Sequence, residues 1–423
     1  MSEQSPTPPS PNIDRAPAVS VTTPRDGLPP LLSTPAEISD AAATLAAGSG
    51  ILALDTERAS GFTYSQRAQL IQLRRNGAGS FLIDPTHCAD PVTDLAPLAA
   101  VINPLPWLLH AADQDLPCLR QLGLKPPQLA DTLVAGRLLG YQKCNLGHLT
   151  EEGLGLHLSK SHSAENWSRR PLPESWLNYA ALDVEYLIEL WDALYAEAHD
   201  RGRDEWIRQE CEFEQCKPDP APKQDPWRST SRIHILKNRR EMEIVRQLWI
   251  SRDKLALQKD IAPGRLLPDR LIIALAEQKP TTEAELKRVK GTQRTRQRSR
   301  WLGAINGALA VPEEKLPAFR LHAGHSIPHQ SQWKRLNPAA AENLTRCRAV
   351  TDEIAQQLAI DAQDLVAGEA LRTLSWSLTE PTPPPSVTES LRSSRARPWQ
   401  ISQIAVPLSE AVSYTHLTLP TAI

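Results

Sequence analysis

The sequence predicts an α/β domain, in which flanking helices cover a mixed β-sheet, followed by one or two all-α helical bundles. Three short apolar runs, bounded by Gly, Asn or Pro, come in succession and predict neighbouring strands. A helix, a fourth strand and a further helix follow, and this order is typical of a mixed sheet covered by helices. Beyond about residue 140 the pattern is helical, and a length of 423 residues allows two or three domains.

The predicted elements of the α/β domain begin after a polar segment. Residues 1–32 are rich in Pro, Ser and Thr, and we expect them to be disordered. Order is predicted to begin at Thr34, because the run Thr-Pro-Ala-Glu has capping-box spacing with Pro at the first helical position, before a helix at residues 38–47. A later helix is predicted to start at Asp113. The predicted strands are residues 50–57, 68–74, 80–84 and 107–111.

Composition divides the rest of the chain. We expect the first domain to cover residues 33–215, since the four prolines in residues 216–227 are typical of a linker. Residues 228–311 predict a compact helical bundle, and residues 333–411 predict a second helical unit. The final segment, residues 412–423, does not fit the preceding composition and resembles translated sequencing-adaptor read-through, so we expect it to be non-native.

Charge is unevenly distributed along the chain, although the net charge is only −2. Residues 227–311 contain 19 Lys or Arg and 8 Asp or Glu, a surplus of +11, so the remainder of the chain carries −13. Such asymmetry favours a basic region that binds a polyanion. A solvated helical surface is the alternative.

Several features indicate the compartment. The six cysteines are scattered without metal-binding spacing, and they predict free thiols in a reducing environment. The N-terminus lacks the apolar core of a signal peptide, and no run of 18 apolar residues is present that could span a membrane. We therefore expect a cytoplasmic protein with no membrane contact.

Carboxylates follow two of the predicted strands. Asp55 and Glu57 lie two residues apart at the end of an apolar strand, so they project to the same side. Two neighbouring anions on a buried strand are costly unless a cation joins them. Asp115 lies just after the fourth strand. Asp183 lies on a long predicted helix, and Tyr179, four residues earlier, shares its face.

These segments, in this order, resemble the DEDDy family of 3′→5′ exonucleases over residues 50–194. The W-S-R-R-P-L segment at residues 167–172 makes the chain similar to ribonuclease D more than to polymerase proofreading domains. The segment that starts at Ile235 resembles an HRDC domain, a small helical bundle shared by ribonuclease D and certain helicases. The resemblance implies an RNase H-like exonuclease domain, an HRDC domain at residues 228–311 and an HRDC-like unit at residues 333–411.

The resemblance also implies the chemistry. The resemblance implies five catalytic residues, which are Asp55, Glu57, Asp115, Tyr179 and Asp183. It also implies that the four carboxylates among them are metal ligands. Four carboxylates in one cleft repel one another, and two divalent cations, Mg²⁺ or Mn²⁺, would cancel that charge through hard oxygen ligands. Two such ions clamp the attacking water and the leaving 3′ oxygen of an in-line displacement. We assign Tyr179 to positioning the water, because a phenol is protonated at neutral pH.

Two nearby acids are expected to have structural roles. The resemblance places the motif aspartate five residues after His110, so we expect Asp113 to cap a helix. Asp131 is expected to be another cap or structural carboxylate.

Basic residues in two places are candidates for nucleic-acid binding. Arg169 and Arg170 could grip phosphates near the 3′ end, or they are surface arginines that pack on helices. The run at residues 287–300 has seven basic residues and no acid, and such a run binds phosphates without reading sequence. These residues are Lys287, Arg288, Lys290, Arg294, Arg296, Arg298 and Arg300. Trp249 and Trp301 are expected in a core rather than as base-stacking platforms.

We expect the protein to remove nucleotides one at a time from the 3′ ends of structured RNA, and the resemblance implies tRNA precursors. A DNA 3′→5′ exonuclease in repair is an alternative, because a metal site alone does not recognise the 2′-hydroxyl. A catalytically silent RNA-binding or scaffold protein is another alternative, which the intact carboxylate set argues against. Nothing in the sequence predicts the oligomeric state.

Overall fold

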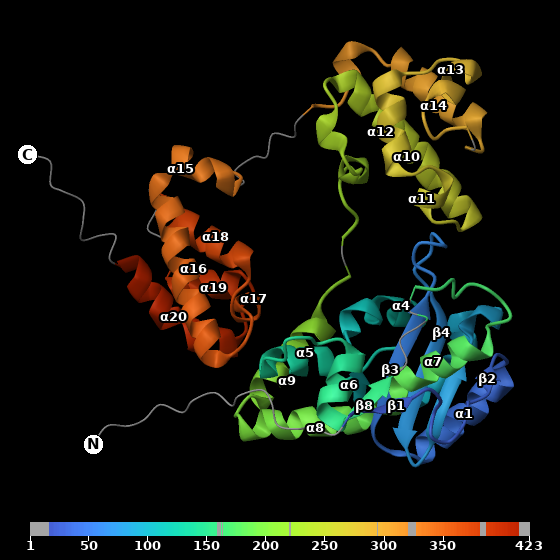
Figure 1. Cartoon of the computed structure of the whole chain (residues 1–423), viewed down its shortest axis with the longest axis vertical. Helices are drawn as coiled ribbons and strands as arrows, with labels where there is room; N and C mark the ends of the chain where they lie inside the picture. The colour runs from blue at the N-terminus through green and yellow to red at the C-terminus, as the bar shows by residue number, and fades with distance from the viewer. Residues whose placement is uncertain are drawn as a thin grey trace, which may run out of the picture.

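The computed structural model describes residues 17–158, 162, 164–219, 221–293, 295–319, 327–380 and 386–413. Figure 1 shows an α/β lobe, coloured from blue to green, and helical lobes coloured yellow and orange to red. Within the described ranges, no helix is both long and apolar enough to cross a membrane.

The α/β lobe is built on a six-stranded sheet with the order β2-β5-β4-β3-β6-β7. The strands are β2 (Leu31–Leu32), β3 (Ser49–Arg58), β4 (Ala68–Asn76), β5 (Gly79–Ile83), β6 (Trp107–Leu109) and β7 (Leu129–Asp131). β4 runs antiparallel to β3 and β5, whereas the other pairs are parallel, so the sheet is mixed as predicted. β2 and β7 were not predicted, because such short strands show a pattern only within a longer apolar run, as β6 does.

Helices cover both faces of this sheet. They are α1 (Pro35–Ala47), α2 (Pro91–Asp94), α3 (Ala96–Ile102), α4 (Leu116–Gln121), α5 (Thr132–Leu139), α6 (Leu146–Leu154), α7 (Glu174–Glu185), α8 (Leu187–Asp200) and α9 (Asp204–Cys216). α1, α3 and α4 pack on the face that contains Leu52 and Leu54, and α7 and α8 pack on the face that contains Ala53. Because side chains alternate along β3, Asp55 and Glu57 point toward α7 and α8.

Residues 17–32 are held against the α/β lobe, so the prediction of disorder was wrong for this part of residues 1–32. The remainder, residues 1–16, lies outside the described residues. β1 (Val19–Val21) pairs in parallel with β8 (Leu156–Leu158). Arg25 Nε donates to Glu185 Oε1 at 2.6 Å, and the Glu185 side chain is only 1% exposed. The segment is rich in Pro and Thr, but backbone pairing and an ion pair with a buried carboxylate order it.

The second lobe has a core of its own. Its helices are α10 (Arg239–Lys259), α11 (Pro263–Leu266), α12 (Asp269–Gln278), α13 (Glu283–Arg288) and α14 (Arg298–Ala310). Trp301 is buried in this core and Trp249 packs against it, as predicted. The loop between β3 and β4 contacts this lobe through a hydrogen bond from Ala262 N to Phe62 O at 2.9 Å. The lobe therefore touches the loop that follows the strand of Asp55.

The C-terminal helices share a core with the α/β lobe. They are α15 (Trp333–Leu336), α16 (Pro338–Leu358), α17 (Ala362–Leu365), α18 (Gly368–Ser377), α19 (Val387–Ser393) and α20 (Pro398–Ser413). One apolar cluster joins residues of α5, α8 and α9 to residues of α16, α18 and α20. Trp399 stacks on Trp206 with ring centroids 4.6 Å apart, and Arg397 Nε donates to Glu210 Oε1 at 2.6 Å.

Two predicted segments flank these lobes. α9 ends at Cys216 and a 3-10 helix begins at Pro226, and the described residues between them form neither helix nor strand. Val412 and Ser413, which we assigned to a non-native tail at residues 412–423, belong to α20. The rest of that tail, residues 414–423, lies outside the described residues.

Candidate active site

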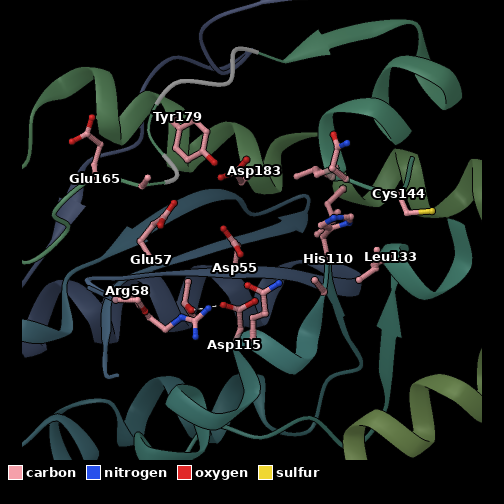
Figure 2. Close-up of a pocket in the computed structure, with 18 residues that line it drawn as sticks. Asp55, Glu57, Arg58, His110, Asp115, Leu133, Cys144, Glu165, Tyr179 and Asp183 are labelled. Atoms are coloured by element: carbon pink, nitrogen blue, oxygen red, sulfur yellow. Dashed lines mark hydrogen bonds between the residues drawn. The ribbon is translucent and has the colours of Figure 1, made fainter. Parts of the chain in front are cut away.

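Two carboxylates project from the end of β3 toward α7. Figure 2 shows Asp55 and Glu57 pointing into a cavity, where Tyr179 and Asp183 approach from the helix on the other side. Carboxylate oxygens of Asp55, Glu57 and Asp183 all lie within 4.8 Å of one another. The structure thus brings together, from strand and helix, residues that are more than 120 positions apart in the sequence.

The C-terminal end of α7 is fixed close to Asp183. Tyr179 and Asp183 lie on one face of the helix because they are four residues apart. The helix ends at Glu185, whose buried carboxylate accepts hydrogen bonds from Arg25 at 2.6 Å and from Arg74 at 3.1 Å. These bonds tie the end of α7 to β4 and to the N-terminal segment, and so restrict the position of Asp183.

Asp115 reaches the cavity from the start of α4. Thr56, which points to the opposite face of β3 from Asp55, donates from Oγ1 to Asp115 Oδ1 at 2.6 Å. Asp115 is not within the 4.8 Å group, but its charge contributes to the raised pKa of Glu57. Asp113 lies exposed in a 3-10 helix (Ala112–Gln114) and forms no cap, so the capping prediction was wrong; the short extra helix takes up the turn before α4.

Asp131 fixes the turn that leads to Asp115. Its two carboxylate oxygens accept hydrogen bonds from Ala111 N at 3.0 Å and from Ala112 N at 2.8 Å. Ala111 has φ of 62°, a left-handed conformation that residues other than Gly rarely adopt. The two hydrogen bonds therefore offset the free-energy cost of this backbone conformation. Asp131 is also the N-cap of α5 and accepts from Leu133 N. The structural and capping role expected for Asp131 is confirmed.

Burial and mutual repulsion raise the pKa of each carboxyl in the cluster. Burial is the larger cause for Asp55, and the Asp183 charge adds to it. Burial comes first for Glu57 as well, followed by the Asp55 charge. Burial also raises the pKa of Asp115, and the Asp55 charge adds to it. Burial raises the pKa of Asp183 too; a hydrogen bond from Tyr179 opposes this rise and the Asp115 charge adds to it. Carboxylates with pKa values raised in this way fit a site for a divalent cation, whose charge would stabilise their ionised forms.

We expect the metal-free protein to lose stability as the pH rises. A carboxyl with a pKa raised in the folded state binds its proton more tightly when folded, so its contribution to stability is complete below the unfolded pKa, about 4, and is lost as the pH rises through the folded pKa. Asp183→Asn removes one such group. In EDTA, the Tm of the wild type should fall by roughly 5 °C more than that of Asp183→Asn between about pH 5 and about pH 8.

The matched control is Asp113→Asn, which removes an exposed carboxylate two residues from Asp115. Its Tm should follow the wild type at each pH, and added Mg²⁺ should restore the wild-type Tm at the higher pH. If the Tm of the wild type and the Tm of Asp183→Asn change in parallel with pH in EDTA, repulsion in the cluster does not destabilise the fold.

The carboxylates open onto a cavity of about 710 Å³. Of the described residues that line it, Arg58 alone is an arginine or lysine. Two lining residues, Arg58 and His110, were not predicted to belong to the site. Arg58 directly follows Glu57, and His110 lies five residues before Asp115. Adjacency to a motif could have suggested both, but sequence spacing does not show which side chains line a cavity.

Arg170 is not available to an RNA phosphate, so the prediction for this residue was wrong. Its Nε and Nη2 donate to the two oxygens of buried Asp84 at 2.6 and 2.7 Å, and its Nη1 donates to Trp167 O at 2.7 Å. This guanidinium holds the loop after β8 to the end of β5. The sequence conceals the pairing because Asp84 lies 86 residues away. Arg169 is exposed, and a phosphate contact there stays a prediction.

The basic run at residues 287–300 lies at one end of the second lobe. In Figure 1, α13 and α14 lie away from the α/β lobe, whereas α11 lies next to it. Glu283 pairs with Lys287 at 3.0 Å and with Arg298 at 3.6 Å, so part of the charge is neutralised locally. Arg300 is half-buried and Arg294 lies outside the described residues. The cations of the run that the structure describes as exposed are Lys287, Arg288, Lys290 and Arg296.

Family models match most of the chain. Residues 31–198 match a model described as a 3′-5′ exonuclease, residues 241–305 match the HRDC domain, and residues 326–412 match a 3′ to 5′ exonuclease C-terminal domain. The last of these covers the unit that we predicted to be HRDC-like, and that likeness stays a prediction.

Known proteins are similar over much of their length. Ribonuclease D of Zymomonas mobilis is 30% identical over 274 residues, which cover 63% of this chain and 69% of that protein. Ribonuclease D of Gluconacetobacter diazotrophicus is 29% identical over 290 residues, covering 66% and 72%.

Solved structures are similar to this chain over most of its length. A protein from Bifidobacterium adolescentis has a TM-score of 0.86 at 34% identity, covering 94% of this chain and all of that one. Escherichia coli RNase D has a TM-score of 0.65 at 23% identity, covering 91% and 99%, and shares the fold. The chain therefore belongs to the ribonuclease D family and is a 3′→5′ exoribonuclease.

Proposed function

We propose that this chain shortens RNA from the 3′ end, one nucleotide at a time, by two-metal-ion hydrolysis that releases nucleoside 5′-monophosphates. The observation that supports this most is the convergence of four carboxylates on one cavity, Glu57 and Asp115 buried and Asp55 and Asp183 half-buried, all with raised pKa. Such a cluster is costly to a fold unless positive charge lies beside it. A reaction that requires cations would explain why the fold bears the free-energy cost of this cluster.

The residues fit hard divalent cations. Asp55, Glu57, Asp115 and Asp183 would hold two ions, Mg²⁺ or Mn²⁺, because their donor atoms are carboxylate oxygens and the group within 4.8 Å contains no sulfur or nitrogen ligand. When bound, the two ions would neutralise the carboxylates, make a water molecule more acidic and stabilise the leaving 3′ oxygen.

Tyr179 would position the attacking water through its hydroxyl. Burial, followed by the charge of Asp183, raises the pKa of this phenol well above its ordinary value. The phenol therefore keeps its proton at any physiological pH, and it acts as a fixed hydrogen-bonding group rather than as a base. Arg58, the arginine of the cavity, would contact a phosphate of the bound strand.

We propose structured RNA with a single-stranded 3′ tail as the substrate, and a tRNA precursor as the physiological example. The exposed cations of α13 and the turn before α14 lie in Figure 1 at the end of the second lobe far from the exonuclease lobe. An RNA body held there would reach the cavity through its tail. The E. coli protein with the same fold is described as an exoribonuclease involved in structured RNA processing, which supports the proposal.

The experiment that tests this function uses 5′-labelled RNA and DNA oligonucleotides of one sequence, with Mg²⁺ or with EDTA. We expect a ladder of RNA products shortened from the 3′ end, formed only with the cation, and slower loss of DNA. Equal or faster loss of DNA would favour the repair exonuclease. Binding of RNA without any product would favour the scaffold protein.

A second prediction concerns the basic run in the full-length protein. We expect replacement of Lys287, Arg288, Lys290 and Arg296 by Gln to weaken binding of structured RNA. Each phosphate contact lowers log affinity by about 0.7 to 0.9 per unit of log salt concentration, so loss of four should flatten the salt dependence by about three units. The measurement is RNA affinity across a salt series, with Ca²⁺ in place of Mg²⁺ to suppress cleavage.

The control for this variant replaces four exposed lysines elsewhere, which are Lys125, Lys217, Lys223 and Lys315. It makes the same change in net charge, and its slope should stay close to that of the wild type. Equal slopes for the basic-run variant and the control would assign the run to solvated surface.

A further inference from the structure

The four carboxylates do not explain a preference for RNA, because cations contact phosphates that RNA and DNA share. His110 is a different kind of group in the same cavity. β3 and β6 are adjacent and parallel, and Ala53 pairs with Leu108. Asp55 and His110 each follow two residues later, so both side chains emerge on the α7 and α8 face of the sheet. Figure 2 shows His110 and Asp55 among the side chains that line this cavity.

Thr132 contacts one ring nitrogen of His110 and leaves the other nitrogen for the cavity. Nδ1 lies 2.9 Å from Thr132 Oγ1, and the same hydroxyl donates to Leu109 O at 3.4 Å. We assign the ring proton to Nδ1, which can donate to Thr132 Oγ1 while that hydroxyl turns toward Leu109 O, an oxygen that only accepts. Nε2 is then unprotonated and acts as an acceptor. Burial lowers the pKa of His110 to about 4, so the ring stays neutral.

A neutral acceptor selects a particular part of a polynucleotide. Phosphate oxygens are themselves acceptors, so they gain no hydrogen bond from a bare Nε2. Donors on the bases change with sequence, whereas the sugar hydroxyls are the same in every nucleotide. The terminal 3′-hydroxyl occurs in both RNA and DNA, and the 2′-hydroxyl occurs in RNA alone.

We propose that His110 accepts a hydrogen bond from the ribose 2′-hydroxyl of a nucleotide beside the scissile phosphate, and thereby makes the enzyme prefer RNA to DNA. This inference rests on the proposed exonuclease function. Thr132 is a positioning residue here, because it holds the ring and sets its tautomer. The proposal makes His110 a specificity residue and leaves the metal-dependent chemistry to the carboxylates.

Two full-length variants separate the two nitrogens. In His110→Asn, the side-chain amide can occupy the place of Nδ1 and keep the bond to Thr132, but the acceptor in the cavity is lost. In His110→Gln, the longer amide can place its oxygen near the position of Nε2, while the bond to Thr132 is lost. The substrates are an RNA oligonucleotide and the same RNA with a single 2′-deoxy sugar, either at the last or at the penultimate position.

The measurement is the single-turnover rate of trimming for each substrate with Mg²⁺. In the wild type, we expect the deoxy sugar at one of the two positions to slow trimming roughly tenfold, the worth of one hydrogen bond. The ratio of ribose to deoxy rates should fall close to one in His110→Asn and stay above it in His110→Gln. A ratio measures the sugar directly, so a general loss of activity from a disturbed fold leaves it unchanged.

The possible outcomes distinguish a failure of this inference from a failure of the proposed exonuclease function on which it rests. A wild type that trims RNA but shows no deoxy penalty at either position overturns the role of His110 and leaves the exonuclease proposal standing. A penalty that persists in His110→Asn overturns it too, because another group then reads the sugar. A wild type that does not trim RNA at all refutes the proposed function itself.

Discussion

Asp183→Asn is expected to abolish turnover while the protein folds normally. The substitution replaces one carboxylate of the 4.8 Å group by a neutral amide of the same size. Metal ions supply several kcal/mol of transition-state stabilisation, and each 1.36 kcal/mol is a factor of ten, so the rate should fall by roughly 10³-fold or more. The measurement is the single-turnover rate on 5′-labelled RNA with saturating Mg²⁺.

The control for Asp183→Asn is again Asp113→Asn, in which an exposed acid of the same type is neutralised. Its rate should equal that of the wild type. RNA affinity measured with Ca²⁺ shows whether the loss in Asp183→Asn lies in chemistry or in binding. A folded Asp183→Asn protein with wild-type activity would remove this residue from the reaction.

Tyr179→Phe should keep RNA binding but lose roughly 10²-fold in rate, the scale for a positioned group in proton handling. The substitution removes only the hydroxyl, so the ring contacts with His162 and Trp167 remain. The hydroxyl also lowers the pKa of Asp183 by hydrogen bonding, so its loss raises that pKa. The rate deficit should therefore shrink somewhat as the pH rises and Asp183 ionises. The pH profile of the single-turnover rate checks this.

Tyr195→Phe is the matched control, since Tyr195 is 42% exposed and does not line the cavity. Its rate should be unchanged. If Tyr179→Phe trims RNA at the wild-type rate at every pH, Tyr179 serves packing between α7 and its neighbours and not the reaction.

Much of the fold could be predicted from local pattern, and the failures have a common physical cause. β3, β4 and β5 are apolar runs with clear boundaries, and the capping box at Thr34 is present in the structure. The N-terminal segment has no such pattern, and only the distant partner Glu185 shows why Arg25 orders it. The core that joins Trp399 to Trp206 likewise depends on contacts between segments far apart in sequence.

The candidate site could be predicted as a set of residues but not as a geometry. Spacing alone placed Asp55 and Glu57 on one side of β3, and the structure shows them facing Asp183. No spacing could reveal that Thr56 holds Asp115 from the opposite face of the strand. Arg170 failed as an RNA-binding candidate because a buried partner consumes its donors, and partners across the fold are what a linear pattern omits.

Two divalent cations bound by the carboxylate cluster are essential to the hydrolysis that we propose. The most direct test is a titration of the protein with Mn²⁺ in the presence of a nucleoside 5′-monophosphate, the product that the proposed reaction releases, followed by electron paramagnetic resonance. We expect two bound ions per wild-type chain and two for Asp113→Asn. Asp55→Asn, which removes one of the three carboxylates of the 4.8 Å group, should lose at least one ion. A wild-type stoichiometry of zero would contradict the two-ion proposal. A stoichiometry that Asp55→Asn leaves unchanged would also contradict it.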